Sequence, residues 1–377
     1  GITGLLIAQG LKKADIPCVV FGKEPPEGRP RDWSVSLHWS YSMLTELLTD
    51  DLLELFKSTQ VDPSYHTSEN DVLPVWNAET GEPMFAYRIS RTKLRRLCLA
   101  GIDIHYCKRL SELSMSEGGE EVTAKFEDGT KCAGSAVVGS DGAKSVVRTF
   151  LVGEEQSVVQ PIPFEAYMTN ARYSVEDAKI LPITRPYIPA DSGGTLSSYQ
   201  YPAQDVRDPE DPTTWEFMIM FSRPVKQGAP STPDVDHLTE AKQLAAQCSD
   251  PFRTAWTNLP KRKTIWYTPL SYWEPIPWDN RGGRVTLGGD AAHAMTFHRG
   301  QGLNHAINDA WCYVTRFKEY VKGRKSLAEA MNEYDHELRE WGREEVRASL
   351  QNTQMLHSWE ECHNSPLFTR GLAKKQE

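Results

Sequence analysis

The chain has 377 residues, of which 39% are hydrophobic and 25% are charged, and its formal net charge at pH 7 is −9. This length is enough for two domains, or one intertwined pair, around a large core. The acidic balance excludes the basic surface that nucleic-acid-binding proteins need. No apolar run approaches the ~18 residues of a transmembrane helix. We therefore expect neither a nucleic-acid partner nor a stable membrane span.

The cysteines point to a reducing compartment. There are seven of them, an odd number, and no Cys-x-x-Cys pair occurs. Such a set is typical of reduced, mostly buried thiols rather than of a disulfide framework. We expect a cytoplasmic protein, and we predict no metal site.

The N-terminal segment is similar to the second half of a dinucleotide-binding fingerprint, G-x-G-x-x-G. In Gly1-Ile-Thr-Gly4, Gly1 takes the place of the second glycine and Gly4 that of the third. A helix is expected over 3–14 and the next strand over 18–21. The first strand and first glycine of the fingerprint are absent, so the parallel sheet as written lacks its central strand. We expect both to precede Gly1 in the intact polypeptide.

The loop after this strand departs from the fingerprint. An acidic residue normally follows the second strand and binds the ribose hydroxyls of the adenosine. Positions 22 and 23 are Gly and Lys here, and Glu24 comes two residues late. Either Glu24 reaches the ribose through a shifted loop, or a dinucleotide binds with weaker adenosine contacts.

The next predicted elements are two helices, a strand and a third helix, over 40–48, 50–58, 85–89 and from Arg91 onward. Alternating apolar residues predict that strand 121–126 pairs with 132–138 in a hairpin through Asp128-Gly129.

A buried apolar strand at 136–140 ends in Asp141-Gly142 and opens a helix. Asp141 either caps this corner of the chain or contacts a ligand.

Residues 153–280 are rich in proline and aromatic residues. Strands expected at 197–201, 215–221 and 264–267 alternate as in an antiparallel sheet. Their aromatic residues either line a pocket for a polycyclic compound or form ordinary sheet core; they include Tyr199, Tyr201, Trp215 and Trp266.

Two glycine-containing segments follow the apolar strand 285–287. They are Gly288-Gly-Asp-Ala-Ala-His293 and Arg299-Gly-Gln-Gly-Leu-Asn304, and a helix is expected over 302–322. The Asp290 carboxylate can accept hydrogen bonds from ribityl hydroxyls. The glycines let backbone N–H groups approach an anionic ligand edge at the helix N-terminus, and the pyrimidine edge of a flavin fits such a cradle.

The fingerprint half, the Asp-Gly element and the Gly-Asp element occur in the order, and with about the separations, of aromatic hydroxylases. Together with Arg29-Pro-Arg-Asp-Trp33 and Leu37-His-Trp39, they make the chain similar to one enzyme family. It resembles the class A, single-component FAD-dependent monooxygenases of the para-hydroxybenzoate hydroxylase type, especially their fungal secondary-metabolite branch. The conjunction of motifs is far more specific than any one of them.

The resemblance implies an α/β fold: a dinucleotide-binding (Rossmann-like) FAD domain with an inserted antiparallel-sheet substrate domain and C-terminal helices. The first part of the FAD domain is expected over 1–152 and the substrate domain over 153–280. The second part of the FAD domain, with its helices up to a charged one at 326–350, is expected over 281–350. Residues 351–377 are expected to form a polar tail or a partner-facing segment.

The resemblance also implies an enzyme that binds FAD and is reduced by NADPH or NADH. It would use O₂ through a flavin C4a-hydroperoxide to hydroxylate or epoxidise a small aromatic or prenylated secondary metabolite. Two alternatives remain: a flavin oxidase or dehydrogenase on the same fold, and a degenerate, non-catalytic flavoprotein. The second is suggested by the broken fingerprint, by Gly22 and by the lack of the family's usual proline between 290 and 302.

The resemblance further suggests roles for single residues. Arg31 is expected near the FAD phosphates or the flavin, and is otherwise a solvated loop charge. Arg91 is expected near the ribityl phosphate, and otherwise starts a helix on a solvated face. His298, the candidate catalytic residue, either donates to the substrate or packs at the pocket wall, whereas His293 is expected to orient its turn. The candidate cofactor-binding residues are Gly1, Gly4, Glu24, Arg31, Arg91, Asp141, Gly289, Asp290, Gly300, Gly302, Leu303 and Asn304.

Overall fold

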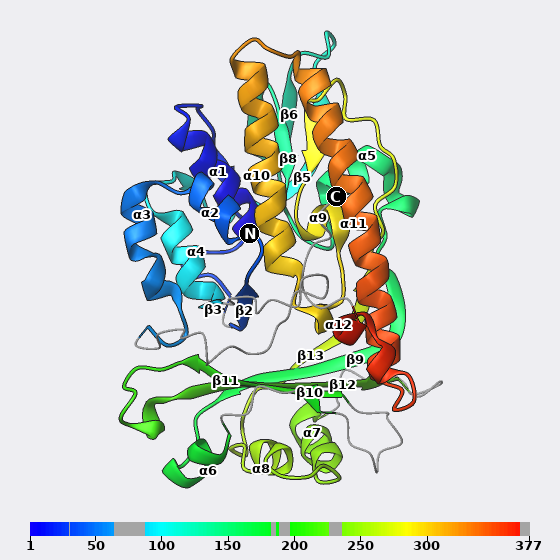
Figure 1. Cartoon of the computed structure of the whole chain (residues 1–377). Coiled ribbons are helices and arrows are strands. Elements are labelled where there is room, and N and C mark those ends of the chain that lie inside the picture. Colours follow the sequence, from blue (N-terminus) through cyan, green and yellow to red (C-terminus); the bar gives the residue numbers. More distant parts are fainter. Residues whose placement is uncertain (30, 64–86, 182–185, 188–196, 226–235, 370–377) are drawn as a thin grey trace.

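The computed structural model describes residues 1–29, 31–63, 87–181, 186–187, 197–225 and 236–369. An α/β part with the longest helices lies on one side of a five-stranded antiparallel sheet (Figure 1). All seven cysteines are free, but only Cys98, Cys248 and Cys362 are buried, so the expectation of mostly buried thiols is wrong. Among the helices of the described ranges, none combines the length and the apolar character needed to cross a bilayer.

Helix α1 (Ile2–Lys13) is the centre of the α/β part. It packs against α10 (Gly302–Val321), α2 (Tyr41–Leu47) and α4 (Arg91–Leu99). The contact is close at Gly10, where a Cβ atom would lie 2.7 Å from Leu47 and 2.8 Å from Val314. The predicted helices at 3–14 and 302–322 are therefore confirmed, and they pack on each other.

Four short strands of the α/β part pair in parallel. They form two separate pairs within the described residues: β1 (Val20–Phe21) with β4 (Ile104–His105), and β8 (Val137–Gly139) with β14 (Val285–Leu287). The other elements of this part up to residue 156 are β2 (Ser34–Leu37), α3 (Asp50–Leu55), η1 (Phe56–Thr59), β3 (Tyr87–Ser90), β5 (Leu110–Met115), β6 (Val122–Phe126), β7 (Lys131–Gly134) and α5 (Val146–Gln156).

The predicted hairpin is confirmed for its first half. Strand β6 pairs with β7, with Val122 opposite Gly134. The second arm was expected to continue to residue 138, but residues 137–139 form β8 instead. The reason is tertiary, because these residues pair with the buried strand β14 rather than with the hairpin.

The antiparallel sheet has the strand order β10-β11-β12-β9-β13. Its strands are β9 (Gln160–Ala171), β10 (Pro186–Tyr187), β11 (Ser197–Asp205), β12 (Glu216–Pro224) and β13 (Trp266–Tyr272). The sequence pattern did not predict β9, although it lies between β12 and β13. Pro161 and Pro163, near the start of this strand, have no backbone N–H to donate to a neighbouring strand, and they make the segment look like a loop.

The two faces of this sheet have different neighbours (Figure 1). Between one face and the helices α6 (Val175–Ile180), α7 (His237–Ala245) and α8 (Phe252–Thr257) lies a cluster that includes Phe217, Phe221 and Trp256. Trp215 is partly buried and packs on this cluster, which supports the sheet-core alternative for this residue. The opposite face carries Met220, which faces the α/β part.

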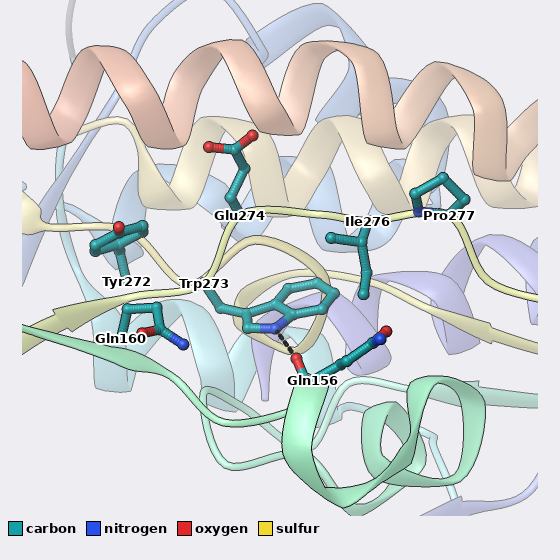
Figure 2. A pocket seen from close by; sticks show the side chains of 7 residues that line it. All are labelled: Gln156, Gln160, Tyr272, Trp273, Glu274, Ile276 and Pro277. Carbon is teal, nitrogen blue, oxygen red and sulfur yellow. Dashed lines mark hydrogen bonds between the residues drawn. The ribbon is translucent and has the colours of Figure 1, made fainter.

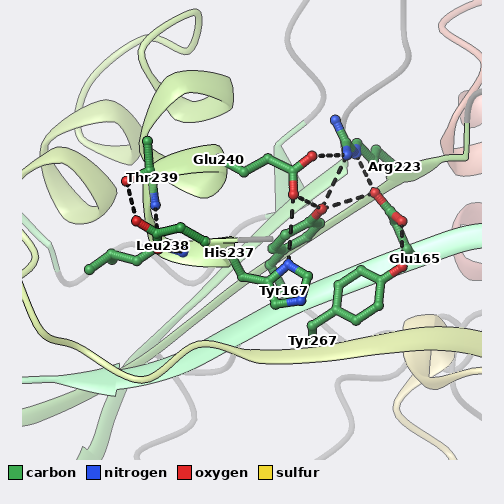
Figure 3. A network of polar contacts seen from close by, with 9 residues as sticks. Glu165, Tyr167, Arg223, His237, Leu238, Thr239, Glu240 and Tyr267 are labelled. Atoms are coloured by element: carbon green, nitrogen blue, oxygen red, sulfur yellow. Dashed lines mark hydrogen bonds and ion pairs between the residues drawn. The ribbon is translucent and has the colours of Figure 1, made fainter. Parts of the chain in front are cut away.

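A polar network ties α7 to the sheet on the first face (Figure 3). Arg223 Nε donates to Glu165 at 2.6 Å, and Nη2 of the same guanidinium donates to Glu240 of α7 at 2.5 Å. The Tyr267 hydroxyl donates to Glu165 at 2.8 Å, and the His237 ring stacks on the Tyr267 ring at 4.3 Å between centroids. Each carboxylate is thus paired within the protein, which indicates a structural role.

Helix α11 (Leu327–Leu356) extends beyond the predicted end at 350. It begins with a capping box between Ser326 and Glu329. Its last turns are buried, including Thr353 and Leu356, because they pack on the antiparallel sheet and on the loop before α10. The remaining elements are η3 (Pro212–Thr214), α9 (Asp290–His293), η4 (Phe297–Arg299), η5 (Cys362–Asn364) and α12 (Pro366–Thr369).

Candidate functional site

Positive charges gather at the N-terminus of α1. Arg91, Arg95, Arg29 and Lys23 lie close enough to this end of the helix to act electrostatically on Gly1. These cations are concentrated here although the net charge of the chain is −9. A helix N-terminus surrounded by cations fits the diphosphate of a dinucleotide.

Arg31 and Arg91 share one aromatic neighbour. Their guanidinium carbons lie 5.4 Å and 4.7 Å from the centroid of the Trp33 ring. Burial lowers the pKa of Arg91, while the charges of Asp32 and Asp290 oppose that change. Arg91 does begin helix α4, as one alternative had it, but its side chain is partly buried against Trp33 and near acidic groups rather than fully solvated.

Two predicted glycines let α1 approach the ends of neighbouring strands. A Cβ atom at Gly4 would lie 2.4 Å from Ser140 Oγ, just beyond β8. A Cβ atom at Gly289, whose φ is +63°, would lie 2.4 Å from Thr3 Oγ1. Close helix–strand packing is the role of the third glycine in the fingerprint, and Gly4 has that environment.

The Asp141 side chain caps helix α5. Its carboxylate accepts from Val146 N at 2.7 Å and from Ser145 Oγ at 2.5 Å. Lys23 Nζ donates to the Asp141 carbonyl oxygen at 3.2 Å. The capping alternative therefore describes the side chain, while the backbone of Asp141 joins the loop that carries Lys23.

Glu24 forms an ion pair with Arg29, with 2.7 Å between Oε1 and Nε. Both side chains remain more than one third exposed. The pair lies in the loop that follows β1, on the side of the cation cluster. This geometry is compatible with either alternative for the adenosine ribose.

The turn at Gly289 is held by a buried carboxylate. Asp309 Oδ2 accepts from Gly289 N at 2.6 Å and lies 2.7 Å from His293 Nε2. Burial lowers the pKa of His293, but the negative charge of Asp309 raises it more strongly, so the pKa lies above its ordinary value. His293 orients the turn, as expected, and Asp290 at the start of α9 stays exposed.

The loop before α10 leaves open space at its two glycines. The 3₁₀ turn η4 ends at Gly300, whose φ is +64°, and α10 begins at Gly302. A Cβ atom at either glycine would meet nothing within 4 Å. The first N–H groups of a helix have no partner inside the helix, so this open end fits the anionic edge of a flavin.

The side chains of Asn304 and Leu303 make their contacts within the protein. Asn304 Oδ1 accepts from His38 N at 3.0 Å and from Ser40 Oγ at 2.9 Å, and its Nδ2 donates to Ser36 O at 3.0 Å. Leu303 is buried in the core. Both residues can therefore offer a cofactor only their backbone N–H groups.

His298 belongs to a closed ring of hydrogen bonds. His357 Nδ1 must carry a proton, because it lies 2.6 Å from the Thr353 carbonyl oxygen. Burial lowers the pKa of both histidines, so neutral His357 accepts at Nε2 from Ser222 Oγ at 2.9 Å. Ser222 in turn accepts from His298 Nε2 at 2.8 Å, and His298 Nδ1 accepts from Thr353 Oγ1 at 2.8 Å.

Both ring nitrogens of His298 are thus used within the protein, between the η4 loop, β12 and α11. Of the two alternatives for this residue, the geometry favours packing at the wall over donation to a substrate. The sequence could not indicate this, because Ser222, Thr353 and His357 lie far from it along the chain.

Sequence reasoning missed part of the cation cluster, namely Lys23, Arg29 and Arg95. One signal was available for Arg95, since it lies four residues after Arg91 and therefore on the same face of α4. In the described ranges, no group of three or more His, Cys, Asp or Glu residues is arranged to hold a metal ion.

A separate pocket of about 510 Å³ lies where the chain crosses between the two parts (Figure 2). Trp273 forms part of its wall and donates from Nε1 to the Gln156 carbonyl oxygen at 2.8 Å. None of the residues that line it belongs to the predicted cofactor set. They are Gln156, Gln160, Tyr272, Trp273, Glu274, Ile276 and Pro277.

Comparison with known proteins gives concordant results. The FAD binding domain family matches residues 95–349. The FAD-dependent monooxygenase cctM of Talaromyces islandicus is 37% identical over 384 residues, covering 100% of this chain and 95% of that protein. The FAD-dependent monooxygenase phnB of Penicillium herquei is 33% identical, covering 99% and 93%.

Among solved structures, HpxO of Klebsiella pneumoniae is similar in fold. The TM-score is 0.72 at 19% identity, covering 98% of this chain and 90% of HpxO. The predicted α/β fold and the resemblance to class A enzymes are thereby confirmed. The chain belongs to the FAD-dependent monooxygenases.

Proposed function

We propose that this enzyme uses NADPH or NADH and O₂ to hydroxylate or epoxidise a small aromatic or prenylated secondary metabolite. The observation that carries this proposal is the apolar sheet face opposite the Gly300 loop. Met168 and Trp266 on that face, and Phe297 from η4, each remain partly exposed. Partly exposed apolar side chains beside a cofactor loop suit an aromatic ligand.

The relatives support the same reading. HpxO was crystallised with FAD and uric acid, a small ring compound. The names of cctM and phnB describe both as FAD-dependent monooxygenases from fungi. Family membership thus favours monooxygenation over a flavin oxidase, a dehydrogenase or a degenerate flavoprotein.

When bound, FAD supplies the activation of O₂, and the residues of the chain position the reactants and exclude water. The cations around Gly1 would hold the diphosphate, and the N-terminus of α10 would face the pyrimidine edge. Phe297 and the methionines of the sheet would shield the reaction from solvent. His298 would keep this wall in place, because its ring nitrogens are already bonded.

Replacing Gly302 with valine is expected to weaken FAD binding without weakening the cofactor-free fold. The new side chain would meet only open space in the protein, but it would fill the cradle proposed for the flavin. Overpacking costs about 1–3 kcal/mol, so the Kd for FAD should rise about 5- to 150-fold. Fluorescence titration measures the Kd, and the Tm of the cofactor-free variant serves as the control. An unchanged Kd would show that the flavin does not bind at this loop.

The proposed reaction is tested with isotopically labelled O₂ and candidate metabolites. We expect NADPH or NADH to bleach the flavin absorbance and one labelled oxygen atom to enter the product. An oxidase or dehydrogenase would instead be bleached by its substrate and would leave the product unlabelled. A degenerate flavoprotein would show no bleaching. Either result would overturn the proposed function.

A further inference from the structure

Asn170 is a buried polar residue on the sheet face that looks toward the α/β part. Its backbone pairs with Met218 of β12, and Met168 two residues earlier pairs with Met220. Residues directly opposite in antiparallel strands share a face. Met168 and Met220 belong to the cluster that contains Phe297, so Asn170 lies on the apolar face opposite the Gly300 loop.

Only one half of the Asn170 amide is hydrogen-bonded. Its Nδ2 donates to the Asp32 carbonyl oxygen at 3.0 Å, and this contact fixes which way the amide points. Its Oδ1 has no hydrogen-bond partner in the described part of the chain, although the residue is only 7% exposed. A buried acceptor left without a donor destabilises a protein, and such atoms are rare in native structures unless a ligand or water satisfies them.

The surroundings of Asn170 connect it to the cofactor site. The Asp32 residue to which it donates immediately precedes Trp33, and Trp33 contacts Arg31 and Arg91. Asn170 therefore lies where the antiparallel sheet meets the loop at the proposed FAD site. Its neighbours on the sheet are methionines, whose flexible side chains adapt to many ring shapes. A single fixed acceptor among them would determine which ligand orientation is preferred.

We infer that Asn170 Oδ1 accepts a hydrogen bond from a hydroxyl or N–H group on the substrate ring and thereby selects ligands that carry such a donor. This inference rests on the proposed function, because it takes the substrate to bind between this sheet face and the flavin. A ligand without the donor would leave Oδ1 buried and unsatisfied, and would bind more weakly by the cost of that atom.

The test compares the binding of naphthol and of methoxynaphthalene, which lacks the donor, to the oxidised FAD-loaded protein. Perturbation of the flavin absorbance reports both Kd values. Wild type is expected to prefer naphthol by about 5- to 150-fold. Asn170→Leu and the smaller Asn170→Ala, which both remove the acceptor oxygen, should bind the two probes about equally.

The inference is overturned if Asn170→Leu keeps the wild-type preference, or if wild type shows no preference or binds neither probe. It is also overturned if Asn170→Ala keeps the preference, and this second variant decides the matter if the leucine variant does not retain FAD. A purely structural role would change the Tm without changing the ratio of the two Kd values. The probes need no turnover, so failure here is distinct from failure of the labelled-oxygen experiment.

Discussion

The free energy of unfolding is expected to fall by about 3–5 kcal/mol when Glu345 of α11 is replaced by alanine. Its carboxylate forms an ion pair with Arg299, which is 4% exposed, and lies 3.4 Å from His305 Nε2. Burial raises the pKa of Glu345, but hydrogen bonds and charges from His305 and Arg299 bring it below the ordinary value. Glu345 is therefore charged at neutral pH, and its removal leaves a buried guanidinium without the carboxylate that balances it.

The neighbouring residue provides a matched control. Glu344 lies on the same helix but is exposed, so Glu344→Ala should change the unfolding free energy by no more than about 0.5 kcal/mol. Adding Arg299→Met to Glu345→Ala should restore part of the loss, because the double variant buries no unbalanced charge. Urea unfolding measures all the variants. Equal losses for the two single glutamate variants would contradict the assignment.

The same pair holds the Gly300 loop in place. Arg299 immediately precedes Gly300, so α11 anchors the loop whose open end is proposed to receive the flavin. Glu345→Ala should therefore raise the Kd for FAD as well as lower stability. This link between a helix near the C-terminus and the loop before α10 has no signature in the local sequence.

Local patterns were sufficient for the elements that carry their own signals. The helix expected over 302–322 is present as α10, the apolar residues 285–287 form the expected strand, and His293 orients the turn at 288–293. The helix, the strand and the turn follow from local sequence and backbone geometry, whereas the carboxylate that holds His293 comes from Asp309 of α10. Gly289 and Gly300 do adopt the positive φ angles that glycine favours.

Tertiary partners determined what the local patterns could not predict. Asn304 was expected at the cofactor, yet its side chain holds residues 36–40. His298 was a candidate for catalysis, yet partners from β12 and α11 occupy its ring. The cations around Gly1 come from separate loops and a helix, and only the fold brings them together.

Acid is expected to destabilise the fold through His38, which is 4% exposed. Its Nε2 lies 3.2 Å from Asn304 Nδ2, which can only donate, so neutral His38 accepts there. Burial, followed by the charges of His305 and Arg299, lowers the pKa of His38 from 6.5 to about 3. Between these two values the unfolded chain binds a proton that the folded chain does not. The stability due to neutral His38 is thus complete above pH 6.5 and is lost as the pH falls below it.

Replacing His38 with glutamine should remove this dependence, because the amide oxygen can still accept from Asn304 but does not titrate. Between pH 6.5 and 5, wild type should lose about 2 kcal/mol that His38→Gln does not lose. The difference between the two proteins is the useful quantity, since it cancels other buried groups such as Asp335, whose pKa burial raises to about 6. Exposed His336 on α11 is the control, and His336→Gln should follow the wild-type pH dependence. A constant difference between wild type and His38→Gln across this range, measured by urea unfolding, would show that His38 is not held neutral.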